Sequence, residues 1–187
     1  MQPFKDLLRN PNTLTLFRIA VIPLIVILLY FDESPLCTFI AAMLFSAAAI
    51  TDYLDGFYAR RRGLESTLGK VMDPVADKLL VSSAFIMLAS LGWVEAWIVC
   101  IIIGRELAVT GLRNIIAGKG EDVSASNLGK YKTGFQIAAI IPLMIHYRSF
   151  FGLNAQAVGE VMLWGALVFT LWSGADYFIK FRQLLKG

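Results

Sequence analysis

Four aspartates stand in two closely spaced pairs in the first half of the chain. Asp52 and Asp55 are three residues apart, and Asp73 and Asp77 are four residues apart. On a helix, either spacing places the two carboxylates on one face. Because long apolar segments flank both pairs, the carboxylates lose hydration and repel one another. Protons or cations must therefore neutralise part of their charge.

An all-oxygen donor set of this kind limits the metals that can bind. Carboxylates favour hard divalent ions such as Mg²⁺ or Mn²⁺ over zinc, and the sequence has no Cys/His spacing typical of a zinc site. Two such ions, bridged by shared carboxylates, can clamp a phosphoryl group during transfer. Small residues on the same segments would let a nucleotide or diphosphate approach the backbone: Gly56, Ala59 and Gly69. Taken alone, Asp73 before Pro74 is also compatible with a simple helix cap followed by proline in the first turn.

The elements that carry these acids are apolar helices. Hydrophobic residues make up 57% of the 187 residues and charged residues 17%, below the roughly 25% charged of ordinary soluble domains. Six apolar segments approach the ~20 residues that cross a bilayer as helix. They are expected at about 13–31, 36–59, 74–91, 93–117, 132–150 and 156–178. The sequence thus predicts an all-α integral membrane protein with six transmembrane helices.

The first residues predict a different kind of helix. Phe4, Leu7 and Leu8 fall on one helical face, with charged residues around the rest, which favours a short amphipathic helix lying on the membrane. A frayed tail is the alternative. We expect one membrane domain over residues 1–187, with an interfacial segment at 1–11 and a six-helix core at 12–180.

The basic residues predict the orientation in the membrane. The formal net charge is only +3, but lysine and arginine gather at one set of helix ends, whereas the opposite connections near 32–35, 91–96 and 148–155 carry only Arg148. By the positive-inside rule, both termini and the four acids are cytoplasmic. Short basic stretches of this kind suit anionic lipid and phosphate, so no nucleic-acid partner is expected.

The acids form part of a longer motif. The pattern Asp-x2-Asp-Gly-x2-Ala-Arg-x8-Gly-x3-Asp-x3-Asp runs without gap or mismatch from Asp52 to Asp77. It resembles the signature of the CDP-alcohol phosphotransferase family. The resemblance implies a six-span, usually homodimeric membrane enzyme that displaces CMP from a CDP-linked lipid or alcohol with two divalent cations.

The resemblance also implies roles for individual residues. Asp52, Asp55 and Asp73 would be metal ligands, and Asp77 would contact the second metal and act as base on the acceptor hydroxyl. The CDP moiety would be lined by Asp52, Gly56, Ala59, Arg60 and Gly69.

A second group of charges bears on the acceptor. Arg105 and Arg113 are two helical turns apart, within about a quadrant of one another, and Lys130 and Lys132 begin the next apolar segment from the same side. Four cations together suit a dianionic phosphate. Glycerol 3-phosphate carries such a group, whereas glycerol, serine and free inositol do not. The alternative is that these cations only set the topology.

Further motifs extend the resemblance along the chain. Residues 11–18, 104–106, 110–113 and 126–133, with Gln136, resemble family members that use glycerol 3-phosphate. These members imply CDP-diacylglycerol as donor, membrane lipids as surroundings and a bacterial cytoplasmic (inner) membrane location.

Two alternatives remain: another acceptor, such as inositol phosphate or a phospholipid, and a divalent-cation transporter. Acids at span ends and the lack of a repeat disfavour transport. Arg18 either snorkels to the interface or assists the site.

Overall fold

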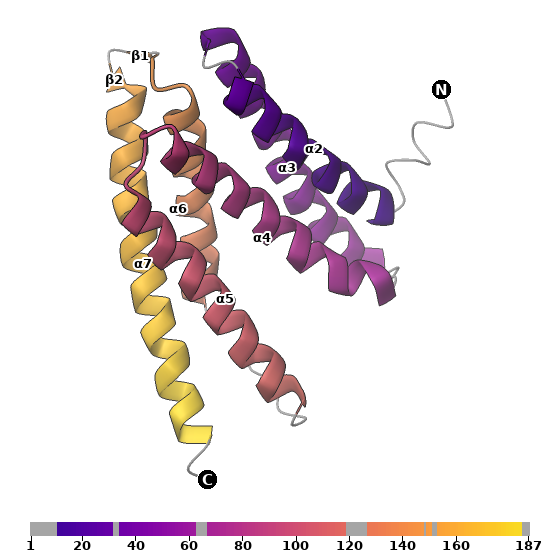
Figure 1. The fold of residues 1–187 in the computed structure, drawn as a ribbon. Helices are drawn as coiled ribbons and strands as arrows, with labels where there is room; N and C mark the ends of the chain where they lie inside the picture. The colour runs from indigo at the N-terminus through magenta and orange to yellow at the C-terminus, as the bar shows by residue number, and fades with distance from the viewer. Residues whose placement is uncertain are drawn as a thin grey trace. The chain divides into compact units, whose positions relative to one another are not determined.

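The computed structural model describes residues 11–31, 34–62, 67–118, 127–147, 149–150 and 153–184. Six helices follow one another along these residues (Figure 1): α2 Pro11–Phe31, α3 Pro35–Arg62, α4 Thr67–Ser90, α5 Ala96–Gly118, α6 Asn127–Met144 and α7 Ala155–Leu184. Between α6 and α7, strand β1 (Ser149–Phe150) pairs antiparallel with β2 (Leu153–Asn154). The predicted all-helical class is confirmed for this part of the chain, apart from that small hairpin. The predicted interfacial helix at Met1–Arg9 lies outside the described residues.

Each helix overlaps one predicted apolar segment, and the differences lie at polar ends. Helix α4 begins at Thr67 instead of near 74, and α6 begins at Asn127 instead of near 132. At the C-terminal ends, α6 stops at Met144 instead of near 150, and α7 continues to Leu184 instead of stopping near 178. Hydropathy detects only the apolar part of a helix, whereas backbone hydrogen bonding continues through polar turns.

Local sequence fixes where two of the helices begin. Ser34 precedes α3, and its Oγ accepts a hydrogen bond from the Cys37 amide at 3.4 Å, with Pro35 in the first helical position. Asn154 precedes α7, and its Oδ1 accepts from the Gln156 amide at 3.0 Å. Both are side-chain caps that satisfy amides left free at a helix start.

One helix in the described part is long and apolar enough to cross a membrane, namely Ala155–Ile179 within α7. Shorter apolar helical stretches are Thr15–Phe31 and Pro35–Thr51. In α5 the apolar sequence is interrupted by Arg105, Glu106 and Arg113. The six-span count therefore stays a prediction.

The chain divides into two compact units, and the first comprises Met1–Met87. Here α2 packs along α3. Val21, Ile25 and Leu29 repeat about every turn on one face of α2 and are fully buried. Arg18 continues this face and is only 1% exposed, so the snorkelling interpretation of Arg18 is wrong.

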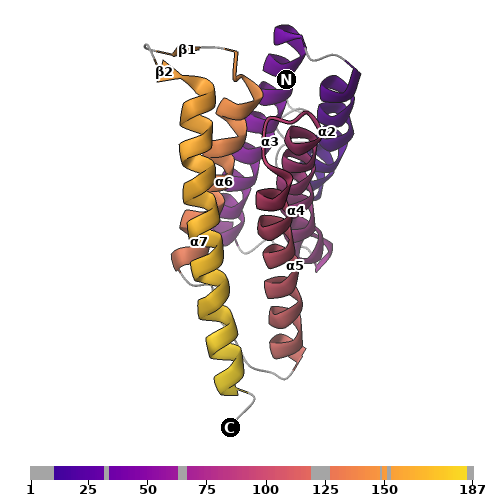
Figure 2. The ribbon, with the colours of Figure 1, turned by 60° about the vertical axis from the view of Figure 1, so that its left-hand side comes forward.

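The second unit comprises Leu88–Gly187. Helix α7 packs along α6 and also contacts α5; α6 and α7 lie side by side in both views (Figures 1 and 2). Two glycines of α7 permit this close approach. A Cβ at Gly159 would lie 2.6 Å from Leu143 Cγ, and one at Gly165 would lie 2.7 Å from Phe135 Cδ1. Small residues at such crossings are typical of helices that pack closely within membranes.

Candidate active site

The two acid pairs each lie on one continuous helix of the first unit. Helix α3 runs unbroken through Asp52 and Asp55, and α4 runs through Asp73 and Asp77. The predicted placement of each pair on a single helix is therefore correct. Because α4 begins at Thr67, Asp73 is not its N-cap, and the simple capping interpretation is wrong.

Pro74 lies inside α4, next to the second acid pair. Proline has no amide hydrogen, so it removes one i→i−4 hydrogen bond and leaves a carbonyl free for another partner. Asp77, one turn further on, is half-buried.

The remaining acids can be placed only by their backbones. The side chains of Asp52, Asp55 and Asp73 lie outside the described set, as do those of the predicted CDP-binding residues Gly56, Ala59, Arg60 and Gly69. Among the side chains that are described, no three His, Cys, Asp or Glu residues gather. Convergence of the four acids, and metal binding by them, therefore stay predictions.

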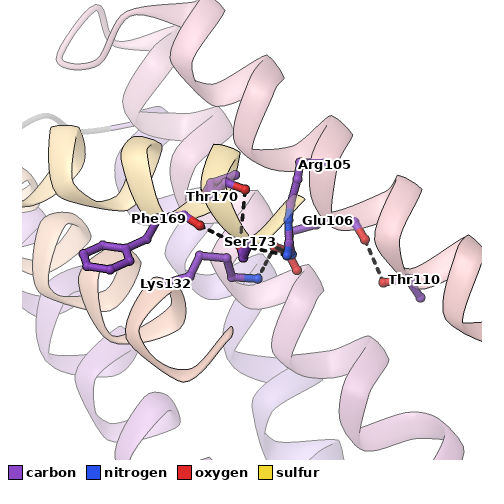
Figure 3. Close-up of polar contacts among 7 residues, drawn as sticks. All are labelled: Arg105, Glu106, Thr110, Lys132, Phe169, Thr170 and Ser173. Atoms are coloured by element: carbon purple, nitrogen blue, oxygen red, sulfur yellow. Dashed lines mark hydrogen bonds and ion pairs between the residues drawn. The ribbon is translucent and has the colours of Figure 1, made fainter. Parts of the chain in front are cut away.

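The second unit contains a compact charged cluster, formed by α5 and α6. Arg105 Nη1 donates to Glu106 Oε1 at 2.9 Å, and Lys132 Nζ donates to the same oxygen (Figure 3). The side chains of Arg105, Glu106 and Lys132 are only 10%, 16% and 7% exposed. Two cations on one carboxylate leave one net positive charge in a largely buried place. Buried charges need partners, and Glu106 is the partner that both cations share.

Helix α7 holds the other end of the Arg105 guanidinium. Arg105 Nη2 donates to Ser173 Oγ at 2.9 Å, and Ser173 Oγ in turn donates to the Phe169 carbonyl at 2.6 Å (Figure 3). The absence of a side chain at Gly174 makes room for Arg105, because a Cβ there would lie 3.2 Å from Arg105 Cγ. The guanidinium is therefore fixed at both terminal nitrogens.

A tyrosine on α7 links the two arginines of α5. The Cζ atoms of Arg105 and Arg113 lie 5.9 and 5.5 Å from the centroid of the Tyr177 ring. At these distances a guanidinium is attracted to the negative face of an aromatic ring. Tyr177 itself is buried, whereas Arg113 is exposed. The ring therefore keeps the exposed Arg113 close to the buried cluster.

Several buried polar atoms near the cluster have no hydrogen-bond partner among the described residues: Arg105 Nε, Gln136 Nε2 and Thr170 Oγ1. Gln136 is one turn from Lys132 on the same face of α6, and Thr170 is one turn from Ser173 on α7. Unsatisfied buried donors are uncommon in folded proteins and call for a partner. These buried donors lie on α5, α6 and α7, the three helices that form the cluster.

The four predicted acceptor-phosphate cations can now be placed. Arg105 and Lys132 meet on Glu106, and Arg113 lies beside them on the Tyr177 ring. The Lys130 side chain lies outside the described set.

Three residues of this cluster were not predicted as site residues: Glu106, Ser173 and Tyr177. Glu106 could have been found, because an acid inside an apolar segment needs a cationic partner. Ser173 gives no such signal, because a helical serine commonly bonds its own backbone.

Comparison with known proteins agrees with the motif. A sequence model of the CDP-alcohol phosphatidyltransferase family matches residues 8–172. The chain belongs to this family, and the predicted resemblance is confirmed.

Curated relatives match over nearly the whole chain. A Bacillus subtilis protein named CDP-diacylglycerol--glycerol-3-phosphate 3-phosphatidyltransferase is 44% identical, over 94% of this chain and 96% of its own length. A Rickettsia bellii protein of the same name is 40% identical, over 90% and 92%. An Arabidopsis thaliana protein, named CDP-diacylglycerol--glycerol-3-phosphate 3-phosphatidyltransferase 1, chloroplastic/mitochondrial, is 37% identical. The match covers 94% of this chain and 63% of that protein.

Proposed function

We propose that this chain transfers the phosphatidyl group from CDP-diacylglycerol to glycerol 3-phosphate, giving phosphatidylglycerophosphate and CMP. The observation that carries the proposal is 44% identity, over 94% of the chain, to a protein named for this reaction. The unbroken acid motif on α3 and α4 supplies the residues that the chemistry needs.

The reaction is a direct displacement at phosphorus. The acceptor hydroxyl oxygen attacks the phosphorus that bears the diacylglycerol, the bond from that phosphorus to the CMP oxygen breaks, and CMP leaves with the bonding electrons. The Asp77 carboxylate takes the hydroxyl proton; a positioned carboxylate can serve as such a base. The position of Asp77 supports this role, because it is half-buried on α4 and shares a helix face with Asp73, four residues earlier.

The other acids fit a pair of divalent cations, Mg²⁺ or Mn²⁺. Asp52, Asp55 and Asp73, together with Asp77, offer only oxygen donors, from two helices and at same-face spacing. When bound, the cations offset the charge of the diphosphate and polarise its phosphorus–oxygen bonds. The CDP moiety is assigned to Asp52 and to the neighbouring small and basic residues Gly56, Ala59, Arg60 and Gly69.

The acceptor phosphate is assigned to Arg105, Arg113, Lys130 and Lys132. Support comes from the meeting of Arg105 and Lys132 on Glu106, with Arg113 close by on the Tyr177 ring. Arg105 Nε also has no hydrogen-bond partner among the described residues. Charge-assisted hydrogen bonds to phosphate are about twice as strong as neutral ones, so a few such donors can select a dianionic acceptor.

We further propose that the chain is a homodimeric, multi-pass protein of a bacterial cytoplasmic membrane, with both termini and the active site cytoplasmic. Six spans and a single domain over 1–187, with an interfacial segment at 1–11, are part of this proposal. An exposed apolar stripe on α7 supports contact with acyl chains: Val161, Trp164, Val168 and Leu171. The family match also crosses from the first compact unit into the second.

An acceptor panel tests the proposed reaction. Purified protein would receive CDP-diacylglycerol with glycerol 3-phosphate, glycerol, serine, inositol phosphate or a phospholipid, and CMP release would be measured. We expect release with glycerol 3-phosphate only, and none in excess chelator. Preference for another acceptor would overturn the acceptor assignment, and full release in chelator would overturn the two-metal mechanism.

A further inference from the structure

Glu106 and Ser173 contact the basic cluster but have no role in the reaction as described so far. We propose that both are positioning residues, which hold Arg105 and Lys132 in the orientation that receives the acceptor phosphate. This inference rests on the proposed function and concerns the same site.

The first argument is electrostatic. Arg105 and Lys132 carry like charges in a largely buried place, and both have long side chains with considerable rotamer freedom. Without an anion between them they would repel one another and turn toward solvent. Glu106 supplies that anion, because both cations donate to its Oε1 atom. The shared carboxylate therefore holds both cations at one point between α5 and α6.

The second argument is geometric. Arg105 and Glu106 are adjacent on α5, and adjacent helical side chains point about 100° apart, so they do not face each other by default. Their contact at 2.9 Å therefore requires both to turn toward a common point. The Lys132 ammonium lies at that point and comes from another helix.

Ser173 fixes the remaining freedom of the guanidinium. Its hydroxyl hydrogen is directed to the Phe169 carbonyl at 2.6 Å, which leaves its oxygen to accept from Arg105 Nη2 at 2.9 Å. With Nη1 on Glu106 and Nη2 on Ser173, the guanidinium plane cannot rotate freely. Its Nε, which has no hydrogen-bond partner in the described part of the chain, then points in a fixed direction.

The chain offers matched controls for both residues. Ser46 also donates to the carbonyl four residues earlier, at 2.7 Å from Ala42, but no arginine donates to it in the described structure. Glu160 is an exposed acid on α7 whose Oε1 accepts from Gln156 at 2.9 Å. The variants are therefore Ser173→Ala and Glu106→Gln, compared with Ser46→Ala and Glu160→Gln.

Two measurements on the full-length protein separate positioning from simple structural support. Steady-state kinetics, with each substrate varied in turn, give KM for glycerol 3-phosphate and for CDP-diacylglycerol. The rise in unfolding temperature on adding inorganic phosphate reports anion binding without any turnover.

We expect Ser173→Ala to raise KM for glycerol 3-phosphate about 3- to 10-fold, and Glu106→Gln about 10-fold or more. KM for CDP-diacylglycerol should change less than about twofold, because its diphosphate is assigned to the metals and not to this cluster. Stabilisation by inorganic phosphate should fall in both variants and persist in both controls.

Equal rises in both KM values, or an unchanged KM for glycerol 3-phosphate in Ser173→Ala, would overturn the inference. If Glu106→Gln fails to fold, Ser173→Ala still decides. If the wild-type protein does not use glycerol 3-phosphate, the proposed function fails. The phosphate measurement then still tests the positioning of the two cations, and unchanged stabilisation in Ser173→Ala would refute it.

Discussion

Replacing Lys132 with methionine removes one buried charge while keeping an unbranched side chain of similar length. The side chain of Lys132 is 7% exposed, and methionine adapts well to such a packed position. Glu106 keeps its contact with Arg105 at 2.9 Å, so no buried carboxylate is left alone. The net charge of the three side chains falls from one positive to zero, because two cations and one anion become one of each.

The expected loss of acceptor binding equals the contribution of one charged hydrogen bond to the acceptor phosphate. Such a bond contributes roughly 1.5–3 kcal/mol, which corresponds to about 10- to 150-fold at ~1.4 kcal/mol per decade. KM for glycerol 3-phosphate should rise by this factor. KM for CDP-diacylglycerol should change by less than about threefold, because its diphosphate is assigned to the metals and not to this cluster.

The assay is CMP release with one substrate varied while the other saturates. Arg182→Met, at an exposed position in the last turn of α7, controls for general loss of positive charge. A similar rise in KM for both substrates, or no rise for glycerol 3-phosphate, would show that Lys132 serves topology or folding and not acceptor binding.

Three other predictions follow from the acids, the helix contact and the charge bias. Asp77→Asn should abolish turnover while keeping substantial binding of CDP-diacylglycerol in a direct binding assay, because it removes the base and keeps the other carboxylates; near-normal turnover would exclude Asp77 as the base. Gly159→Ala should lower the free energy of unfolding by about 1–3 kcal/mol, because its Cβ would lie 2.6 Å from Leu143 Cγ. In the same denaturation assay Gly134→Ala, which meets nothing within 4 Å, should be neutral or stabilising, and equal losses at both glycines would contradict the packing argument. Reporter fusions should place the C-terminus in the cytoplasm, and an external C-terminus would contradict both the positive-inside argument and the even span count.

Most of the helical framework could be predicted from the sequence, because long apolar runs leave little choice of secondary structure. All six described helices coincide with predicted segments, but the polar first turns of α4 and α6 were missed. Those starts carry Gly69, Asp73 and Lys130 of the site, so their hydropathy resembles that of a loop. The hairpin at Ser149–Asn154 was missed because two-residue strands have no periodicity to detect.

The candidate site was predictable to the extent that it depends on spacing along one helix. The acid pairs share helices as expected, and Arg105 and Lys132 meet although they come from different segments. The contacts that hold Arg105 and Lys132 together depend on tertiary packing. Ser173 reaches Arg105 only because α7 packs on α5, and no local pattern encodes that contact.

The most direct test of the central claim is to follow labelled glycerol 3-phosphate into lipid. Purified protein in vesicles containing CDP-diacylglycerol and Mg²⁺ would receive the labelled acceptor, and both lipid-extractable label and free CMP would be counted. The proposed reaction predicts one labelled phosphatidylglycerophosphate for each CMP, and neither product after chelation. CMP release without label in the lipid fraction would contradict the claim, because the chain would then hydrolyse CDP-diacylglycerol and not transfer its phosphatidyl group.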